Sequence, residues 1–281
     1  MMKILVIMYF GLYVVAARRD GKQKSSLSMR ILNGEAADKS SHSWVAALLE
    51  PTIYDPRLIC GGSIITPRHV LTAARCLVGR NASQVLIAVG EHKLSKIDIT
   101  KLIQSILLSV HQLYDNANGV TVNDIGLVTT NKEIQYTSSV SPICFPTRRL
   151  YLDNHNAMIT VVGWGKTSPT SITNSDDLLE VDLTVYPFVS CYDWFHLSAY
   201  NLRFLNNLCT YAEGKNVLSG DFGSPSILKY TINGKHVQVG IVSFASNPGL
   251  SVQTDVTSFV DWIQVNVNGN MPEQRICTVE M

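Results

Sequence analysis

Short apolar runs of strand length, separated by turn residues, recur along most of this 281-residue chain. They are Ser43–Leu49, Ile59–Ile65, Val85–Val89, Ile103–Val110, Ile125–Val128, Met158–Val162, Leu179–Val185, Ile227–Ile232 and His236–Phe244. The last two runs flank Asn233-Gly234, a dipeptide typical of tight hairpins. Many short strands spaced in this way predict an all-β barrel or sandwich. Near the end, Phe259, Trp262, Ile263 and Val267 recur at helical spacing and predict one helix, which Gly269 would end.

The first thirty residues have the composition of a secretion signal followed by a short propeptide. Lys3 precedes an apolar run from Ile4 to Val15, and Ala16-Ala17 offers small residues for signal peptidase. This run is shorter than the roughly 20 apolar residues that span a bilayer. We therefore expect a signal peptide at 1–17, a propeptide at 18–30, a folded domain at 31–270, a tail at 271–281, and an extracellular protein without a membrane anchor.

The charge of the chain argues against nucleic acid as a partner, and the spacing of its cysteines does not indicate a zinc site. The chain has 23 basic and 22 acidic residues, but six basic and one acidic residue lie within the first thirty. The remaining 17 basic and 21 acidic residues give a net charge of −4, which argues against a nucleic-acid partner. The six cysteines allow fifteen pairings, and none has zinc-like spacing.

Three separated segments resemble the chymotrypsin/trypsin family of serine proteases. They are Cys60–Cys76, which contains Thr-Ala-Ala-Arg-Cys, then Asn123–Val128, which contains Asp-Ile-Gly-Leu, and Gly220–Pro225, which reads Gly-Asp-Phe-Gly-Ser-Pro. Further matches are Arg30–Gly34, Gly163–Gly165 and Asp261–Ile263. The resemblance implies two packed six-stranded antiparallel β-barrels, a C-terminal α-helix and a site in the cleft between the barrels.

The catalytic positions depart from the family pattern. The position of the family's nucleophilic serine matches Phe222, and that of its histidine base matches Arg75. A benzyl group has no nucleophilic atom, and a guanidinium stays protonated at neutral pH. Only the orienting aspartate remains, as Asp124. We expect Arg75 to pair with Asp124, against the alternative that both are tolerated remnants, and we predict that the chain is not an enzyme.

The specificity pocket implied by the resemblance is also altered. Asn216 falls at its floor, and Ala245 and Ser251 fall where its walls carry glycine in the family. Added side chains there predict a shallow or closed pocket. Two alternatives are open for Phe222: it forms an exposed apolar patch beside Phe244, or it folds down into the vacant pocket.

The family pattern also implies disulfide pairings, and the sequence contains one candidate modification site. Cys60–Cys76 and Cys191–Cys209 match family disulfides. Cys144 and Cys277 are left over, so we prefer an intramolecular pair, with a free thiol or an intermolecular link as the alternative. Asn81-Ala82-Ser83 is a glycosylation sequon, used or unused. We expect no metal and no cofactor.

The activation switch of the family is retained in the sequence. Arg30-Ile31 matches the cleavage site, and Asp221 matches the carboxylate that receives the new α-amine.

The resemblance to noncatalytic arthropod members of the family implies a binding protein that acts as a cofactor or decoy in a cascade of immunity, clotting or venom. Its expected partner is an extracellular protein, a protease or a zymogen. The alternatives are an endopeptidase with displaced catalytic residues, for which Ser219 and Ser224 are nearby hydroxyls, and a secreted structural or adhesive protein.

Overall fold

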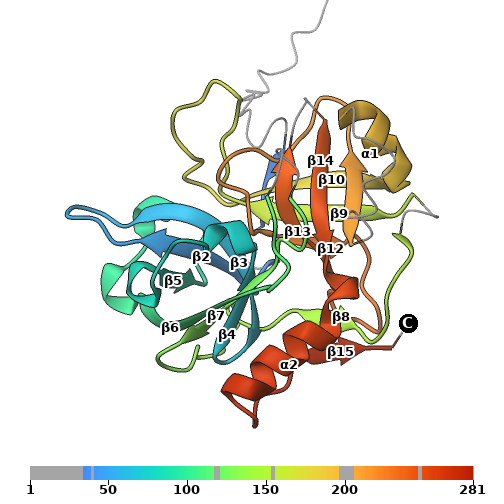
Figure 1. The fold of residues 1–281 in the computed structure, drawn as a ribbon. Coiled ribbons are helices and arrows are strands. Elements are labelled where there is room, and N and C mark those ends of the chain that lie inside the picture. Colours follow the sequence, from blue (N-terminus) through green and yellow to red (C-terminus); the bar gives the residue numbers. More distant parts are fainter. Residues whose placement is uncertain are drawn as a thin grey trace, which may run out of the picture.

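The computed structural model of the chain describes residues 34–38, 41–116, 121–152, 156–195, 206–245 and 249–280 (Figure 1). The predicted signal peptide, the predicted propeptide, Arg30 and Ile31 lie outside the described residues. No helix among the described residues is long and apolar enough to cross a membrane.

The first barrel closes from six antiparallel strands in the order β2-β3-β4-β7-β6-β5. These strands are β2 (Val45–Glu50), β3 (Arg57–Thr66), β4 (His69–Thr72), β5 (Leu86–Val89), β6 (Ile103–Val110) and β7 (Gly126–Thr130). The connections contain the short 3-10 helices η1 (Ala74–Cys76), η2 (Ala82–Gln84), η3 (Leu94–Lys96) and η4 (Ile99–Lys101). Leu48, Ile64, Val70, Ile87 and Leu127 are fully buried and belong to the core cluster centred on this barrel.

The second barrel closes in the order β9-β10-β11-β14-β13-β12, and β1 (Glu35–Ala36) adds to the edge of β10. Its strands are β9 (Met158–Gly163), β10 (Leu179–Tyr186), β11 (Asn207–Tyr211), β12 (Pro225–Leu228), β13 (Gln238–Ala245) and β14 (Leu250–Asp255). Along β10, Leu179, Val181, Leu183 and Val185 are buried and alternate with more exposed residues. This period of two places one face of the strand inside the barrel.

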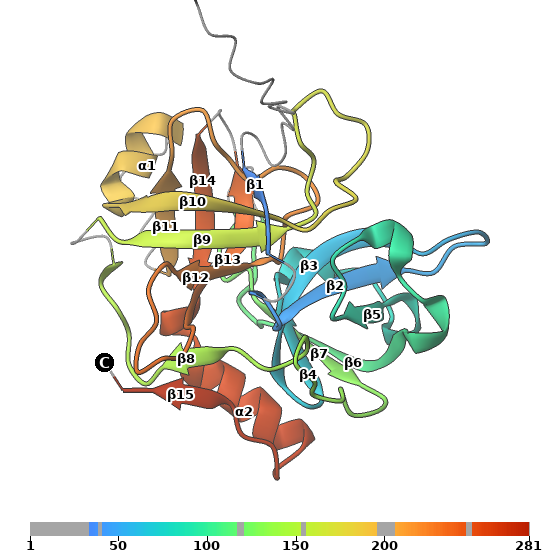
Figure 2. The ribbon, with the colours of Figure 1, turned by 180° about the vertical axis from the view of Figure 1, so that it is seen from behind.

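The helices and the tail complete the fold (Figure 2). Helix α1 (Phe188–Phe195) follows β10, and α2 (Val260–Asn270) follows η8 (Val256–Ser258) and buries Ile263 and Val267. Beyond α2, strand β15 (Cys277–Val279) pairs in parallel with β8 (Cys144–Pro146). The expected fold, two closed six-stranded antiparallel barrels with a C-terminal helix, is confirmed.

The predicted hairpin around Asn233-Gly234 differs in detail from the structure. Asn233 and Gly234 both have positive φ, 51° and 73°, as a two-residue turn of this kind requires. The ladder next to the turn is only the bridge between Ile232 and Lys235, and β12 ends at Leu228 while β13 begins at Gln238. The hairpin is therefore a four-residue and an eight-residue strand joined by residues 229–237.

Buried polar contacts join the two barrels. The Ser63 hydroxyl on β3 donates to Oε1 of Gln238 on β13 at 2.6 Å. The backbone N–H of Gly61 donates to the carbonyl of Phe222 at 2.9 Å, and the Thr254 hydroxyl donates to the carbonyl of Asp124 at 3.0 Å. Because these groups are buried, each contact satisfies polar atoms that water does not reach.

Candidate functional site

The structure brings Arg75, Asp124 and Phe222 together where the two barrels meet. Arg75 lies in η1, next to Cys76, whose disulfide with Cys60 ties η1 to β3. Asp124 lies shortly before β7. Phe222 lies in the turn before β12 of the second barrel. Residues from three distant parts of the chain therefore form one site.

Arg75 and Asp124 form a two-point contact. The Arg75 Nε donates to Asp124 Oδ2 at 2.7 Å, and its backbone N–H donates to Oδ1 at 2.9 Å. Asp124 is fully buried, whereas 21% of the Arg75 side chain is exposed. A charge-assisted pair of this geometry offsets the cost of burying the carboxylate.

Two hydroxyls that the sequence did not single out extend this pair. The Ser243 hydroxyl on β13 donates to Asp124 Oδ2 at 2.7 Å, so that a residue of the second barrel contacts the carboxylate. The second guanidinium nitrogen, Nη2, donates to the Thr121 hydroxyl. The serine carries no local signal of this role, because its partner is set by how the two barrels pack. The threonine carries none either, because its partner lies 46 residues earlier in the chain.

The Phe222 ring lies beneath the Arg75 guanidinium. The guanidinium carbon is 5.2 Å from the ring centroid, within the range of a cation–π contact. Phe222 is partly buried and packs against the core clusters of both barrels. Phe244 instead packs on the smaller cluster around Cys191 and Cys209. Phe222 therefore takes a position between the two predicted alternatives, neither a free patch with Phe244 nor a fully buried plug. We call Arg75, Thr121, Asp124, Phe222 and Ser243 the Arg75 cluster.

Asp221 is a buried carboxylate next to this cluster. Its Oδ1 accepts the backbone N–H of Gly165 at 2.7 Å, and its Oδ2 accepts that of Leu218 at 3.0 Å. Burial raises the pKa of Asp221 to about 7, although these two N–H groups act in the opposite direction. A Cβ at Gly165 would lie 2.1 Å from Oδ2, so only glycine fits there. Ile31, its predicted partner, lies outside the described residues, and the switch stays a prediction.

The residues at the predicted pocket positions are largely enclosed. Asn216 is buried and donates from Nδ2 to the carbonyl of Leu250 at 3.1 Å. Ser251 is fully buried, and its hydroxyl lies 2.8 Å from that of Thr210. Ala245 is partly buried at the end of β13. These contacts describe where the residues lie, and their role in a specificity pocket stays a prediction.

The hydroxyls considered as displaced nucleophiles are placed differently. Ser224 is fully buried, and its hydroxyl oxygen has no hydrogen-bond partner among the described residues. Ser219 is exposed in the turn before Gly220. Neither contacts the Arg75–Asp124 pair through a hydrogen bond described for the structure.

The cysteines form the disulfides Cys60–Cys76, Cys144–Cys277 and Cys191–Cys209. The second of these ties β15 to β8 next to their backbone pairing. Asn81 is exposed before η2, and its N–H donates to Gln84 Oε1 at 2.8 Å. In the part of the chain that the structure describes, no three His, Cys, Asp or Glu side chains gather as metal ligands would.

The chain is similar to serine proteases of arthropods. The protein-family model "Trypsin" matches residues 31–263. Venom serine protease 34 of Apis mellifera is 32% identical over 81% of this chain, which spans 55% of that protein's length. A venom serine protease of Polistes dominula is 30% identical over 92% of this chain and 94% of its own length. Proclotting enzyme of Tachypleus tridentatus is 30% identical over 85% of this chain and 66% of its own length.

These comparisons correct one prediction. The expectation that the chain is not an enzyme is contradicted, because its relatives are named as serine proteases and a proclotting enzyme. That prediction rested on Arg75 and Phe222 at the positions of the histidine base and the nucleophilic serine, whereas the comparisons support the class of serine proteases. The observed contacts of the Arg75 cluster do not depend on it.

Proposed function

Because the chain belongs to the trypsin family of serine proteases, we propose that it acts in an extracellular proteolytic cascade by binding a protease or its zymogen. Relatives named for venom and clotting favour this setting. The apolar run at Ile4–Val15 favours export through a signal peptide. The cascade role is that of a cofactor or decoy.

The observation that carries the proposal is the organisation of the Arg75 cluster. Asp124 holds the Arg75 guanidinium over the Phe222 ring, and one fifth of the arginine side chain remains exposed. Arginine and aromatic side chains are enriched among the residues that contribute most to protein–protein binding. Since the Arg75 side chain is already held in place, contact with a partner costs little further side-chain entropy at Arg75.

A binding experiment with matched variants tests the proposal. The secreted chain is immobilised, and an arthropod clotting zymogen or its active form is passed over it. We expect saturable binding that Arg75→Ala and Phe222→Ala weaken. Arg275→Ala, which alters an exposed arginine of the tail, is the control and should bind like the wild type. Absence of binding to both forms, or equal binding by all variants, would overturn the proposal.

The names of the relatives favour a second candidate function, peptide hydrolysis. Phe222 offers no nucleophilic atom, so hydrolysis here would use another hydroxyl, such as Ser219. Labelling with a fluorophosphonate probe, followed by mass mapping of the labelled residue, separates this candidate from binding. Stoichiometric labelling of Ser219 with turnover of a peptide amide would establish it, and no labelling would remove it.

A further inference from the structure

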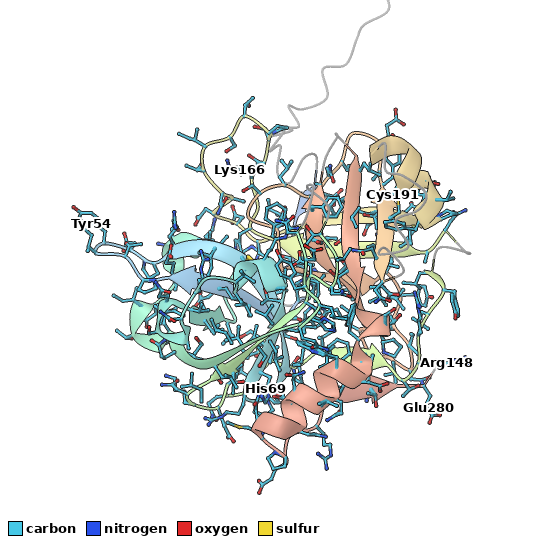
Figure 3. All side chains as sticks on the ribbon, in the orientation of Figure 1. Tyr54, His69, Arg148, Lys166, Cys191 and Glu280 are labelled. Carbon is cyan, nitrogen blue, oxygen red and sulfur yellow. A yellow bond between two sulfur atoms is a disulfide. The ribbon has the colours of Figure 1, made fainter. Side chains whose placement is uncertain are left out.

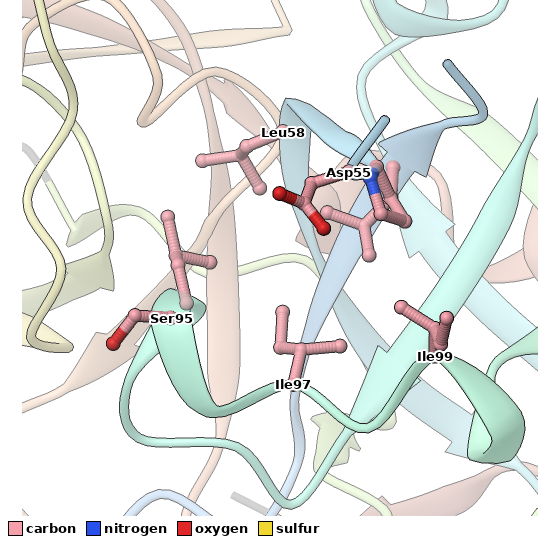
Figure 4. Close-up of a pocket in the computed structure, with 8 residues that line it drawn as sticks. Asp55, Leu58, Ser95, Ile97 and Ile99 are labelled. Carbon is pink, nitrogen blue, oxygen red and sulfur yellow. The ribbon is translucent and has the colours of Figure 1, made fainter. Parts of the chain in front are cut away.

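Two segments of the first barrel form the walls of a partly open pocket of about 280 Å³, which is lined by six apolar residues together with Asp55 and Ser95 (Figure 4). The end of β2, the following loop and the start of β3 form one wall, and residues 94–99 form the other. The apolar lining residues are Leu49, Pro56, Leu58, Leu94, Ile97 and Ile99. An apolar cavity of about 150 Å³ holds a benzene-sized group. This pocket therefore has room for an aromatic side chain or two aliphatic ones.

The surface beside the pocket exposes further apolar side chains. Ile99 is 60% exposed at the rim, and Ile53 and Tyr54 at the tip of the β2–β3 hairpin are 89% and 86% exposed. Figure 3 shows Tyr54 at the outer end of this hairpin, which Figures 1 and 2 both place on the side away from the second barrel. Ile99 lines the pocket, and Ile53 and Tyr54 directly precede the lining residue Asp55 in the chain. Exposed apolar side chains near a pocket are typical of an interaction surface. None of these residues belongs to the Arg75 cluster.

One acidic side chain faces into the pocket. Figure 4 shows the Asp55 carboxylate directed toward the space between Leu58 and Ile97. Only the backbone carbonyl of Asp55 is engaged, by the Thr52 hydroxyl at 2.7 Å, and within the described structure its carboxylate has no hydrogen bond or ion pair.

The basic side chains near the pocket do not neutralise Asp55. Arg57 pairs with Glu50, and Lys101 pairs with Asp98 at 3.4 Å. Lys96 is exposed and does not line the pocket. Asp55 is an exposed residue, so its carboxylate is a hydrated negative charge without a cationic partner, next to the apolar side chains of the pocket.

This combination restricts what can cover the pocket. A partner that fills it removes water from the Asp55 carboxylate, and that is unfavourable unless the partner also supplies a cation. We propose that the pocket docks a protein segment that inserts an apolar side chain and places an adjacent lysine or arginine against Asp55. A purely apolar segment leaves the carboxylate unpaired, and an acidic segment is repelled.

Peptide binding to the secreted full-length chain tests this proposal. The probes are fluorescein-labelled hexapeptides with Leu-Arg, Leu-Gln or Leu-Glu at their centre and glycine elsewhere, measured by fluorescence anisotropy. We expect the Leu-Arg peptide to bind about tenfold more tightly than the Leu-Glu peptide. Asp55→Lys should reverse that order, which a change in folding alone would not do.

A second pair of variants tests the apolar part of the site. Ile99→Asn should weaken the Leu-Arg peptide about fivefold, whereas Ile172→Asn, at an isoleucine that is 93% exposed on another loop, should leave it unchanged. The proposal is overturned if the Leu-Arg peptide does not bind at about 1 mM, if the Leu-Arg and Leu-Glu peptides bind equally, or if Ile99→Asn and Ile172→Asn behave alike. No protease takes part in the assay, so its outcome is independent of the role proposed for the Arg75 cluster.

Discussion

The guanidinium carbon of Arg75 lies 5.2 Å from the centre of the Phe222 ring, so a cation of the first barrel rests on an aromatic side chain of the second. The two side chains come from η1 and from the turn before β12. Asp124 holds the arginine in place by accepting a hydrogen bond from its Nε. The contact therefore depends on the relative placement of the barrels, and its removal tests how far it stabilises them.

Phe222→Ala should lower the free energy of unfolding by about 2 kcal/mol. Truncation of a fully buried phenylalanine costs about 3–5 kcal/mol, and Phe222 is only partly buried. Phe222→Leu, which keeps much of the apolar contact but removes the ring, is the control and should cost less than half as much. Urea unfolding of the three proteins measures both values, and equal stability of all three would show that the ring contributes nothing to the fold.

Arg75→Ala should destabilise the chain by about 3 kcal/mol, since it leaves the buried Asp124 carboxylate without its cation. The double variant Arg75→Ala with Asp124→Asn removes the stranded charge and should recover part of that loss. A double-mutant cycle in urea gives the coupling free energy. If the double variant is as unstable as the sum of the single variants, the pair is not coupled.

Asp221 should make the uncut chain less stable as the pH rises from 4 to 7. The unfolded carboxyl loses its proton near its usual pKa of 3.8, whereas the folded one keeps it up to about 7, so the unfolded state is favoured between these values. The expected loss is of the order of 4 kcal/mol. Asp221→Asn shifts the stability by a constant amount and should remove this slope. Parallel pH profiles for the two proteins would contradict the prediction.

Cleavage after Arg30 should reverse the contribution of Asp221. The α-amine of Ile31 would give this carboxylate a cation and favour its charged form, so stability near pH 7 should rise relative to the uncut chain. Hydrogen exchange measures the local effect, and protection should increase at residues 216–224 after cleavage. Asp221→Asn should abolish the increase. Identical exchange in the cut and uncut chains would mean that the switch no longer operates.

His69 should make the chain less stable as the pH falls from 6.5 to 4. The side chain is fully buried, its Nδ1 lies 2.8 Å from the Thr66 hydroxyl, and burial, with the nearby Arg68 charge, lowers its pKa to about 4. The unfolded state binds a proton below about pH 6.5 while the folded state does not, which costs about 3 kcal/mol at pH 4. His69→Gln should lose less stability over this range in urea unfolding. An unchanged difference between the two proteins at pH 7 and pH 4.5 would refute it.

The barrels could be predicted from the sequence because their strands carry local patterns. The alternation from Leu179 to Val185 identifies one face of β10, and the run Ile103–Val110 coincides with β6. Strand β4 (His69–Thr72) is not among the predicted runs, because it has only four residues and two of them, His69 and Thr72, are polar. The end of β12 at Leu228 was also missed, because apolar residues continue beyond the point where the ladder stops.

The Arg75 cluster was predictable only in part. Family motifs identify the loops that carry Arg75, Asp124 and Phe222, and in the family these three loops meet at one site. Ser243 carries no such mark, because a serine hydroxyl in a buried strand finds its acceptor only after the second barrel packs against the first. The position of Phe222 was left open because the sequence does not show what surrounds the ring. In the structure it contacts the Arg75 guanidinium and the core clusters of both barrels.

The polar contacts between the barrels affect how the molecule comes apart. Ser63 with Gln238, Ser243 with Asp124, and Gly61 with Phe222 are each formed by one group from either barrel. Separating the barrels would leave these buried groups unpaired at the same moment, and the core around Phe222 would open as well. The two halves therefore lack independent melting behaviour, and heating should produce a single calorimetric transition. Ligand binding to either half would then raise the melting temperature of both.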